Sequence, residues 1–223
     1  MVNIAPSKDR SDGIMKRQSN SQSRSAVLVF SCFCLLHPTV THSQTTMSVL
    51  ESVCDGDAEK GIEHVFSFAK KGNSAATFLL AMMFAENNSP DLTQKYLETS
   101  ASQGSSSAMS ALGQIAFNER DFSKAHNWFE AAAKLRNVNS LMYLGIMYRD
   151  GLGVNVSHEA AYFWFINAQK LKKTSVEGDI EPSEFASDVV VNLPAVKIAT
   201  LSEDSKKWIE EHQEPPEVSI PPC

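Results

Sequence analysis

The 223-residue chain lacks several features that would assign it to a common functional class. It has no long hydrophobic run: the apolar stretch at residues 26–36 is too short to cross a bilayer as a helix, which requires about 20 residues. Beyond that stretch no tract of lysine and arginine occurs, which argues against nucleic acid and anionic lipid as partners. Two of the four cysteines lie inside the stretch, so the rest of the chain can form at most one internal disulfide.

The N-terminal region has the pattern of a secretory signal peptide. A basic segment, residues 15–24, precedes the apolar stretch, and small side chains follow it up to Ser43. We expect residues 1–43 to be this signal peptide, with cleavage after Ser43, and we expect translation to start at Met15 because acidic residues lie ahead of it. A single N-terminal anchor or a lipid anchor at Cys32 is the alternative.

Removal of residues 1–43 changes the charge and location expected of the mature chain. Five basic and two acidic residues are lost, so the net charge moves from −6 to −9. The mature protein is expected to be periplasmic or secreted, with no stable membrane insertion. In such a compartment the remaining cysteines, Cys54 and Cys223, can form one disulfide. Because they flank the folded region, this bond requires the C-terminal tail to fold back, and free thiols or an intermolecular disulfide are the alternatives.

An internal repeat of 32 residues predicts the architecture. Residues 107–113 read SAMSALG and residues 139–145 read NSLMYLG, and each is followed by a segment of the type AxxWFxxA, at residues 125–132 and 161–168. Self-similarity at a period of about 20 to 50 residues indicates helical or other supersecondary units that bury their apolar faces by stacking. Within each unit the apolar residues recur at helical spacing. We therefore expect an all-α fold, an α/α solenoid of antiparallel helix pairs with C-terminal capping helices.

The expected organisation follows the repeat. It comprises an N-terminal segment at 44–56, a half unit at 57–71, repeat units at 72–103, 104–135 and 136–171, a linker with capping helices at 172–214, and a Pro-rich tail at 215–223.

Each unit pairs a small residue on its first helix with large residues on its second. A glycine inside a helix costs about 1 kcal/mol relative to alanine, so its presence indicates close approach of another helix. The small residues are Ala81, Gly113 and Gly145; Leu112 and Leu144 precede the glycines; and the large residues expected to anchor the second helices are Tyr96, Trp128 and Trp164.

These residues resemble a known repeat. Residues 140–168 carry a Leu-Gly-x-x-Tyr segment, a Gly-x-Gly-Val loop and an Ala-x-x-Trp-Phe segment, which is similar to the Sel-one-like repeat (SLR), a relative of the tetratricopeptide repeat. The resemblance extends over residues 57–171. It implies an α/α solenoid that acts as an adaptor or scaffold for protein assemblies, often in the bacterial envelope.

The repeat ends after Leu171, and different elements are expected beyond it. A polar segment at 172–181 indicates a loop, and residues 182–192 are compatible with a helix. A final helix is predicted at residues 201–212, with Ser202 as its cap and acidic residues in its first turn. This helix would cap the stack.

Motifs for chemistry are sparse. Ser67 and Lys70 match the Ser-x-x-Lys of penicillin-recognising enzymes, but no Ser-Asp-Asn follows, so a β-lactam-recognising hydrolase is an alternative rather than the main hypothesis. Stacking of sugars on the aromatic anchors, as in glycan or peptidoglycan binding, is a second alternative. The histidines show no metal-ligand spacing with one another or with the remaining cysteines. We therefore expect no catalytic, cofactor or metal site.

The repeats and the signal peptide together favour an exported adaptor. The partner is expected to be a protein or peptide that binds the concave face built by the first helices, where side chains between the packing positions are free to vary. Nothing in the sequence specifies the oligomeric state.

Overall fold

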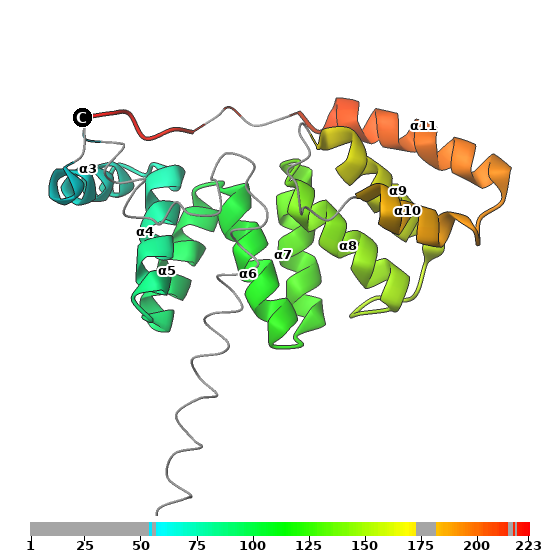
Figure 1. The fold of residues 1–223 in the computed structure, drawn as a ribbon, viewed down its shortest axis with the longest axis horizontal. Helices are drawn as coiled ribbons and strands as arrows, with labels where there is room; N and C mark the ends of the chain where they lie inside the picture. Colours follow the sequence, from blue (N-terminus) through cyan, green and yellow to red (C-terminus); the bar gives the residue numbers. More distant parts are fainter. Residues whose placement is uncertain (1–53, 55–56, 173–181, 214–215, 217) are drawn as a thin grey trace, which may run out of the picture.

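The computed structural model describes Cys54 and residues 57–172, 182–213, 216 and 218–223 (Figure 1). These residues form helices and connecting turns without a strand, so the all-α prediction is confirmed. The predicted signal peptide and residues 173–181 of the loop predicted at 172–181 lie outside the described residues. The helices are α3 (Ala58–Lys70), α4 (Ser74–Glu86), α5 (Pro90–Ser102), α6 (Ser106–Asn118), α7 (Phe122–Lys134), α8 (Val138–Asp150), α9 (His158–Leu171), α10 (Pro182–Val190) and α11 (Ala195–Glu211).

The helices pack as a row of hairpins. α4 packs against α5, α6 against α7, and α8 against α9, and each hairpin then contacts the next through α5 with α6 and α7 with α8. α3 precedes α4 as a single helix that packs on the first hairpin. This arrangement is the α/α solenoid that the 32-residue repeat predicts (Figure 1).

Local signals at equivalent positions begin each hairpin. The first helix of every hairpin has a polar N-cap whose side chain accepts a hydrogen bond from the backbone N–H three residues later. These caps are Asn73, Ser105 and Asn137. The residue before each cap has a positive φ, 86° at Gly72, 89° at Gly104 and 60° at Arg136. A left-handed residue ends the preceding helix, so the junctions share one geometry even where arginine replaces glycine.

Within each hairpin, a small residue on the first helix lets a large side chain of the second helix pack closely against it. A Cβ placed on Gly113 would lie 2.6 Å from two carbons of the Phe129 ring, and a Cβ on Gly145 would overlap the ring of Phe165. Both rings are fully buried. In the first hairpin the same positions hold Ala81 and Leu97, which pack in one buried cluster. Alanine on the first helix is thus paired with leucine on the second, whereas glycine is paired with the larger phenylalanine.

The capping helices extend the stack at its C-terminal end. Both α10 and α11 pack on α9. The prediction that the last helix begins near Leu201 with Ser202 as its cap is wrong, because α11 begins at Ala195, directly after Pro194. A serine followed by two acidic residues imitates a helix start, but the preceding six residues are also compatible with helix, and a proline before them provides the earlier boundary.

A buried polar contact joins α11 to α9. The Ser205 hydroxyl donates to Asn167 Oδ1 at 2.8 Å, and both residues have no exposed surface. Lys170 Nζ donates to the same hydroxyl at 3.0 Å, and burial lowers the pKa of this lysine. Because a buried polar atom without a partner is costly, these bonds fix where α11 sits on α9.

Candidate functional site

The first helices of successive hairpins form one face of the stack. α6 contacts α8 as well as its own hairpin partner, α7. On each of these helices the residues at positions i, i+3 and i+7 share one side of the helix. We call these nine residues the A-helix face: Ala75, Phe78 and Met82 on α4, Ser107, Ser110 and Gln114 on α6, and Asn139, Met142 and Ile146 on α8.

The A-helix face differs in chemistry from unit to unit, whereas one packing position beside it is constant. Leu80, Leu112 and Leu144 are identical and buried. By contrast, the last position of the stripe holds methionine in α4, glutamine in α6 and isoleucine in α8. Met82, Ser107, Asn139 and Ile146 are half-buried, whereas Gln114 and Met142 are buried, at 3% and 9% exposed. Ser110 is 2% exposed, and its hydroxyl has no hydrogen-bond partner in the described part of the chain.

The C-terminal tail crosses back over the stack to α3 (Figure 1). Asn73 Nδ2 donates to the Ser219 carbonyl oxygen at 3.0 Å, and His64 Nε2 lies 2.8 Å from the Pro221 carbonyl oxygen. Ile220 packs against the buried cluster around Val65. The tail is thus bound as an extended peptide, through its backbone oxygens and one apolar side chain.

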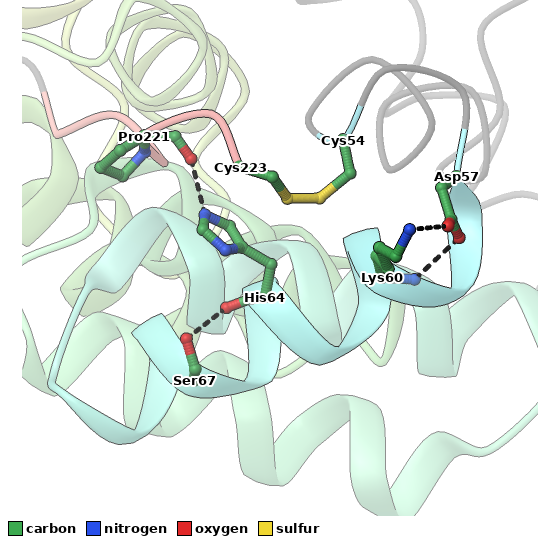
Figure 2. The surroundings of a disulfide bond; sticks show 7 residues. All are labelled: Cys54, Asp57, Lys60, His64, Ser67, Pro221 and Cys223. Atoms are coloured by element: carbon green, nitrogen blue, oxygen red, sulfur yellow. Dashed lines mark hydrogen bonds and ion pairs between the residues drawn. A yellow bond between two sulfur atoms is a disulfide. The ribbon is translucent and has the colours of Figure 1, made fainter.

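The two cysteines meet at the end of this tail. Cys54 and Cys223 form a disulfide, with their Cα atoms 5.0 Å apart (Figure 2). Cys54 is 5% exposed, and its carbonyl oxygen accepts a hydrogen bond from the Asp57 N–H at 2.9 Å. Cys223 is exposed. The bond joins the start of the described chain to its last residue.

His64 lies beside this disulfide, a position that spacing along the chain could not reveal. One ligand atom from each of Cys54, His64 and Cys223 falls within 4.8 Å of the other two. The same helix carries an ion pair one turn earlier, between Lys60 Nζ and Asp57 Oδ2 at 2.8 Å (Figure 2). The hydrogen bonds from Lys60 lower the pKa of Asp57.

The Ser67 and Lys70 pair lies on the exposed side of α3. The Ser67 hydroxyl donates to the His64 carbonyl oxygen at 2.8 Å, which is a bond within the helix (Figure 2). The serine is therefore engaged with its own backbone rather than directed at the lysine.

The predicted aromatic anchors are only partly buried. Tyr96 stacks on Phe84 with ring centroids 5.0 Å apart. Trp128 packs at the edge of the cluster between the first two hairpins. Trp164 meets Trp208 of α11 edge to face, with centroids 5.8 Å apart. The side chains one residue later, Leu97, Phe129 and Phe165, are buried instead. The predicted small residues and the leucines beside them are buried as well: Ala81, Gly113, Gly145, Leu112 and Leu144.

In the part of the chain that the structure describes, no helix combines the length and apolar character needed to span a membrane.

No protein-family model matches the chain, and no curated protein matches its sequence. Among solved structures, the chain is similar to the crystal structure of c5321, a protective antigen present in uropathogenic Escherichia coli strains displaying an SLR fold. The two share 19% sequence identity and a TM-score of 0.39, over 84% of this chain and 46% of that one. This chain thus spans less than half the length of that protein. Its assignment as an α/α solenoid rests on its own helix pairing and its 32-residue repeat.

Proposed function

We propose that this protein is an exported helical-repeat adaptor that binds a segment of a partner protein on the A-helix face. The observation that carries this proposal is the contrast between identical packing positions and a varied face. If the face had only a packing role, the same side chain could recur at each equivalent position of the repeat. Leucine does recur in this way at the buried packing positions Leu80, Leu112 and Leu144. Instead, the half-buried first position of the stripe holds Ala75 in α4, Ser107 in α6 and Asn139 in α8. A stack of similar units with unlike surface residues is suited to recognise a sequence of unlike residues.

The composition of the face favours a peptide over a small molecule. It combines adaptable or branched apolar side chains, such as Met82 and Ile146, with amide and hydroxyl groups, such as Asn139. Such a mixture can contact both the apolar side chains and the polar backbone groups of a bound peptide.

Export is proposed from two features. Residues 15–43 have the basic, apolar and small-residue order of a signal peptide. The pairing of Cys54 with Cys223 also suits an oxidising compartment, where disulfides persist. N-terminal sequencing of the mature protein tests this part of the proposal, and we expect it to begin at Gln44.

Binding is tested by charge substitutions on the A-helix face. We expect Met82→Glu and Ile146→Glu each to reduce recovery of crosslinked partners from the native envelope at least about tenfold, because a buried unpaired carboxylate in an interface costs more than 1.4 kcal/mol. Leu92→Glu on α5, a 40% exposed leucine, is the matched control and should leave recovery unchanged.

The reverse pattern would contradict the proposal. If Leu92→Glu abolished recovery while both A-helix face variants kept it, the partner would bind the second helices. Circular dichroism melting of each variant separates loss of binding from loss of folding.

A further inference from the structure

Three residues with metal-ligating side chains meet where the tail joins α3. The ligand atoms of Cys54, His64 and Cys223 lie within 4.8 Å of one another. In a tetrahedral zinc site, neighbouring ligand atoms are about 3.5–3.8 Å apart, because Zn–S bonds are about 2.3 Å and Zn–N bonds about 2.0–2.1 Å. Shifts of about 1 Å would therefore bring the three atoms to zinc-binding distance.

Contacts other than the disulfide also hold this cluster together. The tail is bound through the Ser219 and Pro221 carbonyl oxygens, at 3.0 Å from Asn73 Nδ2 and 2.8 Å from His64 Nε2. Ile220 packs on the apolar cluster next to α3. The Asn73 and Ile220 contacts involve none of the three ligating side chains and remain available when the bond between the sulfurs is opened, so Cys223 stays close to Cys54 and His64.

We propose that the dithiol form of this protein binds one Zn²⁺ ion through Cys54, His64 and Cys223. Two thiolates and one imidazole form a donor set that zinc accepts, with its fourth position left to water. Soft thiolate ligands also discriminate against Mg²⁺ and Ca²⁺. In the disulfide form the two sulfurs are bonded to each other and no thiolate is available. The tail is thus held by a covalent bond to Cys54, just before α3, in one state and by zinc in the other.

Thiol–disulfide exchange with an external dithiol connects the two states. The two sulfurs of that dithiol form a new disulfide, and its two protons and two electrons convert the Cys54–Cys223 bond into two thiols. Zinc then replaces both thiol protons, which are released to solvent. Zinc affinity therefore rises with pH until both thiols are ionised.

The test is titration of the mature chain, residues 44–223, which lacks Cys32 and Cys34; it is reduced with a phosphine under anaerobic conditions and titrated with Co²⁺ and then Zn²⁺. We expect one ion per chain and a near-ultraviolet thiolate-to-cobalt charge-transfer band that Zn²⁺ abolishes. His64→Ala should weaken zinc binding at least about tenfold, since even loss of an outer-shell partner of a metal ligand costs that much. Cys54→Ser should remove most of the charge-transfer intensity.

Two controls make the result decisive. His212→Ala removes a histidine that stacks on Trp208 at 4.4 Å instead of lying beside the cysteines, and it should leave zinc affinity unchanged. Reduced wild-type chain alkylated at its thiols needs no substitution that could unfold it, and it should not bind zinc at this affinity. The proposal is overturned if the alkylated or the oxidised chain binds zinc as tightly as the reduced chain, or if His64→Ala and wild type bind equally.

Discussion

The contact between Gly145 and Phe165 tests the packing of the hairpins most sharply. Alanine at position 145 would place a Cβ against three atoms of a ring that has no exposed surface. Overpacking of this kind costs about 1–3 kcal/mol, and we expect the upper part of that range because a buried ring cannot move aside freely. Replacing a helical glycine with alanine gains about 1 kcal/mol. The expected net effect of Gly145→Ala is therefore destabilisation by about 2 kcal/mol.

The chain itself suggests the compensating substitution. The first hairpin uses Ala81 with Leu97 at the equivalent positions. Gly145→Ala combined with Phe165→Leu should therefore be less destabilising than the sum of the single substitutions, by about 2 kcal/mol within the usual range for contacting residues. Urea unfolding followed by circular dichroism measures all three variants. Additive effects, or a stabilised Gly145→Ala, would refute the proposed packing.

Three further outcomes are expected. Arg136→Gly should stabilise the protein by about 1 kcal/mol in urea unfolding, because Arg136 has a φ of 60°, which favours glycine; a loss of stability would show that the arginine side chain contributes more than its backbone costs. Cys223→Ser should cost up to about 5 kcal/mol, because the disulfide spans 169 residues and its loss frees the unfolded chain; an unchanged melting temperature would exclude the bond from the native protein. Arg149 donates two hydrogen bonds to the Asp150 carboxylate, at 2.7 and 2.8 Å, and they lower the pKa of Asp150. The pair's contribution to the free energy of unfolding is therefore present above the unfolded pKa of about 3.9, and it is lost as the pH falls through the folded pKa. Asp150→Asn should accordingly flatten the decline of stability below about pH 4, and an identical acid titration would show that the pair contributes nothing.

Periodicity predicts the stack because packing repeats with the units. Glycines at positions 113 and 145 indicate a close helix contact even when the partner side chain is unknown. In the structure each of these glycines lies against a phenylalanine ring of the second helix. Periodicity does not distinguish which of two adjacent aromatic residues is buried. Trp128 and Phe129 differ by 100° around the helix, and only the ring of Phe129 points at the facing glycine.

Apart from the pairing of Cys54 with Cys223, which was one of the options for the two remaining cysteines, contacts between distant segments were beyond the reach of sequence patterns. The position of His64 beside the cysteines depends on a tail that returns across the whole stack, and spacing along the chain carries no record of that path. The early start of α11 was missed for a local reason, since Ser202 and the acidic residues after it resemble a cap although they lie inside a helix. Burial of Ser205 against Asn167, which fixes the helix on α9, depends on tertiary packing.

Site-specific photocrosslinking is the decisive measurement of whether a partner binds the A-helix face. A photoreactive residue placed at Asn139 on α8 samples that face, and the same residue at the exposed Asn127 on α7 samples the second helices. We expect a discrete crosslinked partner from position 139 and none from position 127 in the native envelope. The same partner crosslinking at equal or higher yield from position 127 would contradict this expectation.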